Sequence, residues 1–162
     1  MLKILQRVMG ADDPDTLKYQ VELAHMLKWM GELAEAEQEY RLIYILQEIA
    51  LGKEHPDTLA TQLSLATTLN VEAKYADQER ELRALLEIQR RVLGVKHQNV
   101  VLNYGALARC LRAQGKMQEA LEFAQEFEAG QARILGADAP LAKEAKEFRE
   151  SIEAALKQQP VK

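Results

Sequence analysis

The sequence is poor in residues that break helices or cross-link chains. Its 162 residues include 4 prolines, 8 glycines and one cysteine, and 6% are aromatic. The single cysteine, Cys110, excludes an internal disulfide and favours a reducing compartment, so we expect a cytoplasmic protein. No apolar run approaches the roughly 20 residues that a membrane-spanning helix needs. The opening MLKILQRVMG is too short and too charged for a signal peptide.

The charge balance gives no sign of a polyanionic partner. Charged residues make up 28% of the sequence, and the formal net charge is −4. A weakly acidic chain is not drawn to nucleic acid or to an anionic membrane, so neither is expected as a partner. Hydrophobic residues make up 48%, enough for one folded unit with a continuous core. Ala, Leu, Glu, Gln, Lys and Arg dominate, which is the composition of a helical protein.

A period of 42 residues runs through the chain. Four glycines mark it, at Gly10, Gly52, Gly94 and Gly136, and three of them are followed four residues later by a proline. A period of this length indicates a repeating helical unit. Between the glycines, Leu, Ala and Leu recur at the spacing i, i+1, i+4, which is typical of one helix face. These columns are Leu23, Ala24 and Leu27, then Leu65, Ala66 and Leu69, then Leu107, Ala108 and Leu111.

Each repeat is predicted to hold two helices, called helix A and helix B. Helix A begins at the proline, which suits a first helical position, and helix B ends at the periodic glycine, which suits a left-handed cap. Asp13, His55 and His97 precede helix A and are predicted N-caps. The two histidines also suggest a metal site, but helix pairs spaced about 10 Å apart hold them too far apart to share one zinc. Helix A is predicted over 14–30, 56–72 and 98–114, helix B over 33–51, 75–93 and 117–135, and a capping helix over 139–157.

The pattern predicts a single repeat domain over residues 1–162. Its parts are the end of a truncated helix B (1–10), three repeats (11–52, 53–94 and 95–136) and the capping helix (137–158). The first segment is predicted as a helix B because LKILQRVMG (2–10) aligns with LEIQRRVLG (86–94). Such a half-repeat exposes an apolar face. We therefore expect either a piece of a longer repeat protein or self-association through residues 2–9.

These landmarks resemble the tetratricopeptide repeat, in the 42-residue variety found in kinesin light chains and many bacterial proteins. The resemblance covers the whole chain, and residues 139–162 are its weakest part. It rests on GKEHPDTL (52–59), SLA (64–66) and KYADQE (74–79), and on GADDPDTL (10–17), ELA (22–24) and GELAEAE (31–37). The third repeat contributes GVKHQNVV (94–101), ALA (106–108) and GKMQEAL (115–121). The chain departs from the family at the helix-A Asn, which is replaced by Glu22, Ser64 and Ala106.

The resemblance implies an all-α fold, a right-handed superhelical solenoid of antiparallel helix pairs. It also implies a protein-interaction scaffold, with no enzymatic activity, cofactor or metal, that binds a peptide or a partner domain on its concave helix-A face. The sequence itself offers no nucleophile–base pair and no phosphate loop after a strand. The second hypothesis is a structural, oligomerisation or regulatory arm of a larger bacterial signalling protein.

The helix-A positions opposite the core columns are the candidate partner-binding groove. Arg109 and Arg112 match the charge found at such positions in peptide-binding members, and Asn70 matches the amide. Basic residues there favour an acidic segment through charge-assisted hydrogen bonds. The candidate groove consists of Lys18, His25, Lys28, Trp29, Thr67, Asn70, Asn103, Arg109 and Arg112.

The roles of four further residues are less direct: two of them have two possible roles each, and the other two are expected to have structural roles. His25 is either a groove contact or a polar residue on an exposed helix face. Trp29 either packs against the turn at Gly31 or serves as an exposed anchor for a partner. Gly105 lies inside a predicted helix, at a cost of roughly 1 kcal/mol relative to Ala, and its missing side chain is expected to widen the groove. Cys110 is expected to be a buried, inert thiol.

Overall fold

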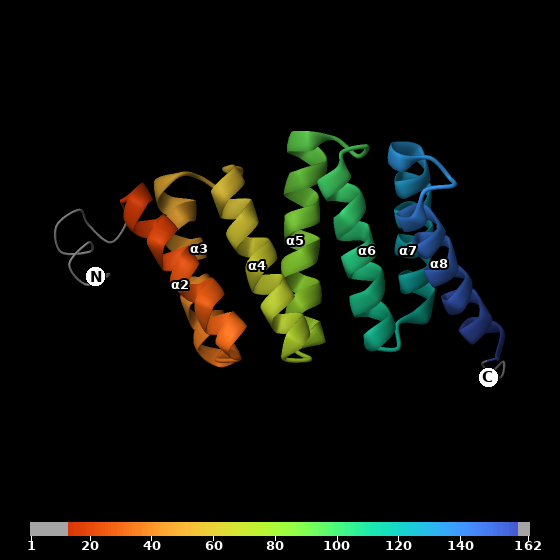
Figure 1. Cartoon of the computed structure of the whole chain (residues 1–162), viewed down its shortest axis with the longest axis horizontal. Helices are drawn as coiled ribbons and strands as arrows, with labels where there is room; N and C mark the ends of the chain where they lie inside the picture. The colour runs from red at the N-terminus through yellow and green to blue at the C-terminus, as the bar shows by residue number, and fades with distance from the viewer. Residues whose placement is uncertain (1–12, 159–162) are drawn as a thin grey trace. The chain divides into compact units, whose positions relative to one another are not determined.

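The structure, a computed structural model, describes residues 13–158, which form helices joined by short turns and contain no strand (Figure 1). Every helix predicted within this range is present, and each boundary lies within one residue of its predicted position. The truncated helix B predicted over residues 1–10 lies outside the described residues. The helices are α2 (Pro14–Met30), α3 (Leu33–Ala50), α4 (Pro56–Val71), α5 (Tyr75–Leu93), α6 (Gln98–Ala113), α7 (Met117–Leu135) and α8 (Pro140–Gln158).

Local capping explains why the boundaries follow the repeat so closely. The Asp13 carboxylate accepts the first free N–H groups of α2, at 3.0 and 3.2 Å. Nδ1 of His55 and of His97 accepts the N–H two residues further on, at 3.2 and 3.1 Å. The predicted N-caps are therefore confirmed, and the histidine cap persists where Gln98 replaces the proline. At the opposite ends of the pairs, Gly52, Gly94 and Gly136 adopt the positive φ that favours glycine, for example 94° at Gly52.

The chain divides into two compact units, and the boundary between them falls within α5. Unit 1 runs to Glu81 and unit 2 begins at Leu82. In unit 1, α2 packs on α3 and α3 packs on α4, whereas in unit 2 α6 packs on α7 and α7 packs on α8. Packed neighbours joined by short turns run antiparallel (Figure 1). The prediction that the chain forms one domain stays a prediction.

In the core of unit 1, one alanine from each helix lies where α2 and α3 meet. Ala24 on α2 and Ala36 on α3 are fully buried, so the two helices approach closely where a larger side chain would hold them apart. Large side chains fill the space on either side of this contact. The cluster consists of Leu17, Ala24, Ala36, Tyr40, Ile43, Leu65 and Leu69.

In unit 2, two glycines permit a close approach of α6 and α7. A Cβ placed on Gly105 would lie 2.9 Å from the ring of Phe127, and one placed on Gly130 would lie 2.5 Å from Val101. The expectation that Gly105 widens the groove is wrong, because the Phe127 ring occupies the space that its missing side chain leaves. Phe127 of α7 thus packs against Gly105 of α6, and Val101 of α6 packs against Gly130 of α7.

Two further expectations concern chemistry rather than packing. Cys110 forms no disulfide, and its thiol is buried on α6, as predicted. Among residues 13–158, no helix combines the length and apolar character needed to cross a membrane.

Candidate protein-binding surface

The helix-A surface of unit 1, formed by α2 and α4, carries three of the predicted groove residues in direct contact with the neighbouring helix. Lys28 Nζ donates a hydrogen bond to Thr67 Oγ1 at 2.6 Å. His25 Nε2 lies 3.3 Å from Ser64 Oγ. Partial burial lowers the pKa of Lys28. These bridges link α2 to α4 and hold the side chains in place on an exposed surface.

A small hollow of about 190 Å³ lies on the same surface of unit 1. Lys18 and His25 line it, as does Ser64. Two acidic residues, Glu22 and Asp57, line it as well, so its charge is mixed. Lys18 itself is already paired with a carboxylate of its own helix at 3.3 Å. The hollow therefore shows no preference for a ligand of one charge.

The C-terminal end of α2 presents Trp29 to solvent. Its exposed fraction is 89%, which removes the interpretation that it packs against the turn at Gly31. Met26 and Met30 beside it are also exposed. Asn70, predicted as a groove residue at the end of α4, is exposed too.

The helix-A surface of unit 2, formed by α6 and α8, holds two arginines against aromatic rings. The guanidinium carbon of Arg109 lies 5.3 Å from the ring centroid of Phe127 and 5.4 Å from that of Phe148. The guanidinium carbon of Arg112 lies 5.6 Å from the Phe148 ring, and its Nη1 donates to Ser151 Oγ at 3.3 Å. Such cation–π contacts orient a guanidinium without neutralising it. Neither arginine pairs with a carboxylate anywhere in residues 13–158.

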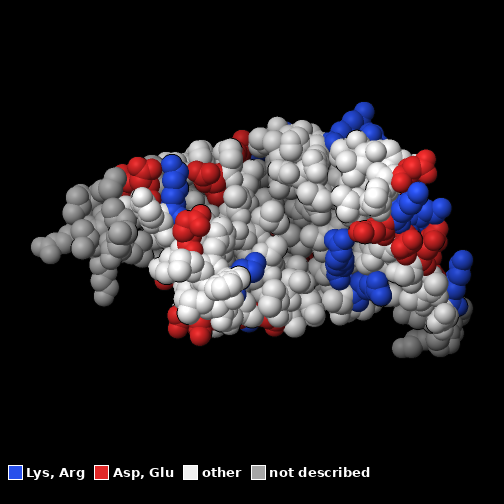
Figure 2. Space-filling view, in the orientation of Figure 1, with Lys and Arg blue, Asp and Glu red and all other residues white. Residues whose placement is uncertain are grey.

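The same contact recurs in both units, two repeats apart. Lys28 bonds to Thr67, and Arg112 at the equivalent position bonds to the equivalent Ser151. In each case the partner lies 39 residues further along the chain, on the next helix A. Sequence reasoning missed Ser151 and Phe148, although this offset from the basic column identifies them. Figure 2 shows more Lys and Arg atoms over α6 to α8 than over α2 to α4.

Asn103 is a predicted groove residue that the structure does not place on the surface. Its exposed fraction is 3%, and its Nδ2 donates to Leu82 O and to Gln89 Oε1, both at 3.2 Å. Both acceptors belong to α5, the preceding helix B. The amide therefore binds α6 to α5 inside unit 2 and is not available to a ligand.

The three histidines occupy separate sites. His55 and His97 are helix caps, whereas the His25 ring lies 5.6 Å from the ring of Tyr40, measured between centroids. Over the described range 13–158, no group of three His, Cys, Asp or Glu side chains is placed to hold a metal ion.

Comparison with known proteins agrees with this architecture. Sequence profiles of the Tetratricopeptide repeat match residues 16–57 and 74–130, which together exceed half of the chain. No curated protein matches the sequence. The structure is similar to that of a Podosopora anserina protein, named as a putative kinesin light chain with nearly identical TPR-like repeats. The TM-score is 0.76 at 25% sequence identity, and the match covers 98% of this chain and 84% of that one.

Two further solved structures are similar. A variant of the same Podosopora anserina protein gives a TM-score of 0.78 at 26% identity, covering 97% of this chain and 79% of that one. BtubC (BKLC) from P. vanneervenii gives a TM-score of 0.57 at 19% identity, covering 93% and 68%, and this likeness concerns the fold alone. The matches confirm the predicted fold class, an all-α repeat fold of antiparallel helix pairs.

Proposed function

Since the chain belongs to the tetratricopeptide repeat proteins, and to their kinesin-light-chain-like type, we propose that it is a cytoplasmic scaffold that binds an acidic segment of a partner protein on its helix-A surface. Tetratricopeptide repeats in general mediate protein–protein interactions. The proposed role involves no catalysis, cofactor or metal. The partner is a peptide or an exposed segment of a folded domain.

The observation that carries this proposal is the pair of arginines on α6. Arg109 and Arg112 are exposed, yet each guanidinium is fixed against a ring, and neither meets a carboxylate within residues 13–158. A fixed guanidinium loses less conformational entropy on binding than a free one. Its remaining N–H groups match the two oxygens of a carboxylate. The two side chains thus favour an acidic ligand that also contacts the Phe148 ring.

The helix-A surface of unit 1 contributes differently to this proposal. Lys28 and Thr67 already bond to each other, and the nearby hollow contains carboxylates as well as cations. We propose that this surface is a separate contact site for polar segments of a partner protein, with Trp29 as an apolar anchor at its edge. A largely exposed tryptophan is the side-chain type most often found to dominate interface energies.

A selection experiment tests the proposal even though the partner is not identified. A library of random peptides displayed on phage is selected on the wild-type protein, and enriched peptides are synthesised. We expect enrichment of Asp and Glu, because the two guanidiniums favour carboxylates. The Arg109→Gln, Arg112→Gln double variant is expected to bind these peptides at least about tenfold more weakly, since charge-assisted hydrogen bonds are lost.

Arg133→Gln provides the matched control. Arg133 is an exposed arginine of α7, a helix B, and the same substitution there removes one positive charge away from the helix-A surface. The control is expected to bind the selected peptides as the wild type does. Enriched peptides that lack acidic residues, or that bind the double variant and the wild type equally, would contradict the proposal.

A second candidate function, an oligomerisation arm, is favoured by an apolar stripe on α2. Tyr19, Leu23, Met26 and Met30 follow the spacing i, i+4, i+7, i+11, and their exposed fractions range from 36% to 65%. The equivalent positions in the next two helices A are buried. They are Thr61, Leu65 and Thr68 on α4, and Asn103, Leu107 and Cys110 on α6. The stripe is therefore a helix-packing face that lacks its neighbour among the described residues.

We propose that a second copy of the chain covers this stripe, α2 against α2. The spacing is that of a two-helix seam, and the four side chains are uncharged and self-complementary. The last helix, α8, offers no matching surface for head-to-tail stacking, because its exposed positions are mostly charged. These positions include Lys143, Glu144, Lys146, Glu147 and Glu150. The oligomeric state of variants in the stripe tests this second proposal.

A further inference from the structure

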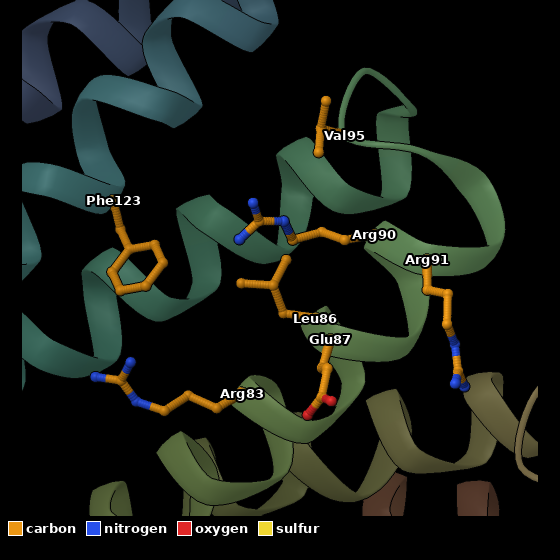
Figure 3. Close-up of a pocket in the computed structure, with 7 residues that line it drawn as sticks. All are labelled: Arg83, Leu86, Glu87, Arg90, Arg91, Val95 and Phe123. Carbon is orange, nitrogen blue, oxygen red and sulfur yellow. The ribbon is translucent and has the colours of Figure 1, made fainter.

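A second recess lies in unit 2, on helices α5 and α7, away from the helix-A surface. Its volume is about 570 Å³, within the roughly 300–1,000 Å³ of known ligand sites. Leu86 and Phe123 face each other across it, and the guanidiniums of Arg83 and Arg90 lie on either side (Figure 3). Glu87 and Arg91 also line the recess, but the Arg91 side chain points away from Phe123 (Figure 3).

The two inward arginines differ in how their charge is satisfied. Arg83 donates to Glu119 at 2.6 Å, and its guanidinium carbon lies 5.6 Å from the Phe123 ring centroid. Arg90 is exposed and forms no hydrogen bond or ion pair with any residue of the described range 13–158. An exposed cation beside apolar side chains is therefore available for a carboxylate from outside the chain.

The equivalent positions in unit 1 show that this arrangement is not a consequence of the repeat. One repeat upstream, Glu48 occupies the position of Arg90 and forms an ion pair with Lys53 at 3.1 Å. The position of Lys53 is taken in unit 2 by Val95, so the pair has no counterpart there. In unit 1 the local charges satisfy each other, whereas in unit 2 an arginine and a valine replace them.

At the position of Phe123, too, a charged residue of unit 1 is replaced in unit 2. Its equivalent in unit 1 is Glu81, which forms an ion pair with Arg41 at 3.5 Å. Arg41 is in turn the equivalent of Arg83. An acidic partner of the arginine has thus been replaced by an aromatic ring, which adds an apolar surface, while Glu87 at the position of Ile45 places a carboxylate in the recess.

A second hollow of about 540 Å³ continues the first. The two share Arg90, Val95 and Phe123, and the second adds Tyr104, whose ring lies 6.0 Å from that of Phe123 between centroids. Glu122 and Glu126 line its far part. The first recess is mainly basic and apolar, although Glu87 also lines it. Arg90, Val95 and Phe123 lie where the two hollows meet, and the second hollow is acidic. This change in charge along the trough suits an extended peptide more than a compact small molecule.

We propose that this α5–α7 trough binds a short peptide segment of a second partner protein, with an acidic residue at Arg90, a leucine-sized apolar residue between Leu86 and Phe123, and a basic residue beside Glu122 and Glu126. The ligand carboxylate accepts hydrogen bonds from the Arg90 guanidinium. The apolar side chain covers the Phe123 ring and Val95. This proposal is independent of the helix-A surface, so one chain can hold two partners at once.

The test is a titration of ¹⁵N-labelled protein followed by NMR. The probe is the capped peptide acetyl-Glu-Leu-Ala-Lys-amide, and the comparison peptide has Gln in place of Glu. We expect saturable shifts at the Arg90 Nε–H and at the backbone amides of Val95 and Phe123. A ligand of this size binds with an affinity of roughly millimolar. The Gln peptide is expected to bind about tenfold more weakly, since it lacks the carboxylate.

Two variants locate the binding. Arg90→Gln is expected to weaken binding of the Glu peptide about tenfold, whereas Arg133→Gln, the same change at an exposed arginine of α7 that lines neither hollow, should leave it within about twofold. Shifts that do not saturate, equal affinity for the two peptides, equal losses in the two variants, or shifts on α6 and α8 in place of α5 and α7 each overturn the proposal. Only the last of these points to the helix-A surface.

Discussion

At the scale of single residues, the neighbourhood of a side chain decides what it does more than its type. Asn103 and Asn70 are both amides on a helix A, yet Asn103 is buried in hydrogen bonds to α5 while Asn70 faces solvent. Arg109 and Arg112 are proposed to act as a pair because each guanidinium lies against an aromatic ring. The position of a residue in the 42-residue repeat therefore predicts its place on a helix, but not whether its polar atoms are available to a ligand.

Gly105 gives the sharpest test at this scale. Gly105→Ala gains roughly 1 kcal/mol of helix propensity, but its new Cβ would lie 2.9 Å from the Phe127 ring. Overpacking of this kind costs about 1–3 kcal/mol. We expect a net loss of up to about 2 kcal/mol in the free energy of unfolding, measured by urea denaturation.

A double-mutant cycle shows whether the clash is the cause. With Phe127→Leu, the ring that meets the new Cβ is gone, so adding Gly105→Ala to that variant should cost much less than it does in the wild type. If the two substitutions destabilise the protein additively, the close contact of α6 and α7 at this glycine is not what limits the side chain there.

At the scale of helices, the sequence predicts the boundaries well because they depend on local chemistry. Asp13 and His97 cap helices through bonds to N–H groups two or three residues away, so their role is visible in a short stretch of sequence. Gly105 could not be assigned in this way, because its role depends on a ring 22 residues further along, on another helix. The exposure of Trp29 and the burial of Asn103 likewise depend on which neighbouring helix is present.

In unit 1 a network of charges joins α3 to the start of α5. Arg41 donates to Glu37 at 2.8 Å and to Glu81 at 3.5 Å, and Lys74 bonds to Glu37 and to Glu72. Burial by itself raises the pKa of Glu37, but the hydrogen bonds from Lys74 and Arg41 outweigh it and hold that pKa below its ordinary value. The side chain of Glu37 is only 14% exposed, so solvent weakens these contacts less than it weakens an ordinary surface pair.

The lowered pKa of Glu37 predicts a pH dependence of stability. A carboxyl group whose pKa is lower in the folded state stabilises the protein above its unfolded pKa of about 4.3, and this stabilisation is lost as the pH falls through the folded value. Glu37→Gln should therefore lower the free energy of unfolding by about 1 kcal/mol at neutral pH. The gap between variant and wild type should close below about pH 4, as followed by urea denaturation across the pH range.

Glu39→Gln is the control for this network. Glu39 lies on the same helix, two residues further on, and forms no hydrogen bond or ion pair with the residues described here. It should change stability little at any pH. A gap between the Glu37 variant and the wild type that stays constant down to acid pH would show that the charge of Glu37 does not stabilise unit 1.

At the scale of the whole molecule, the two units differ in what their surfaces offer. Unit 2 holds both proposed peptide sites, the paired arginines on α6 and the trough between α5 and α7. In the trough, Phe123 replaces the acid found at the equivalent position of unit 1. In unit 1 the equivalent positions form the ion pairs Arg41–Glu81 and Lys53–Glu48, and α2 exposes the apolar stripe. The two acidic-segment sites are therefore assigned to unit 2, and self-association is assigned to the α2 stripe of unit 1.

The α2 stripe predicts a concentration-dependent dimer, which sedimentation velocity measures directly. The wild type should move from a monomer of 18.3 kDa toward about twice that mass as its concentration rises. Met26→Glu places a charge within the stripe and should keep the protein monomeric, because burying an unpaired charge in an apolar seam is unfavourable. Leu141→Glu makes a matched change at another exposed apolar residue, on α8, and should leave the dimer intact. A wild type that stays monomeric, or a dimer that survives Met26→Glu, rules out the α2 seam.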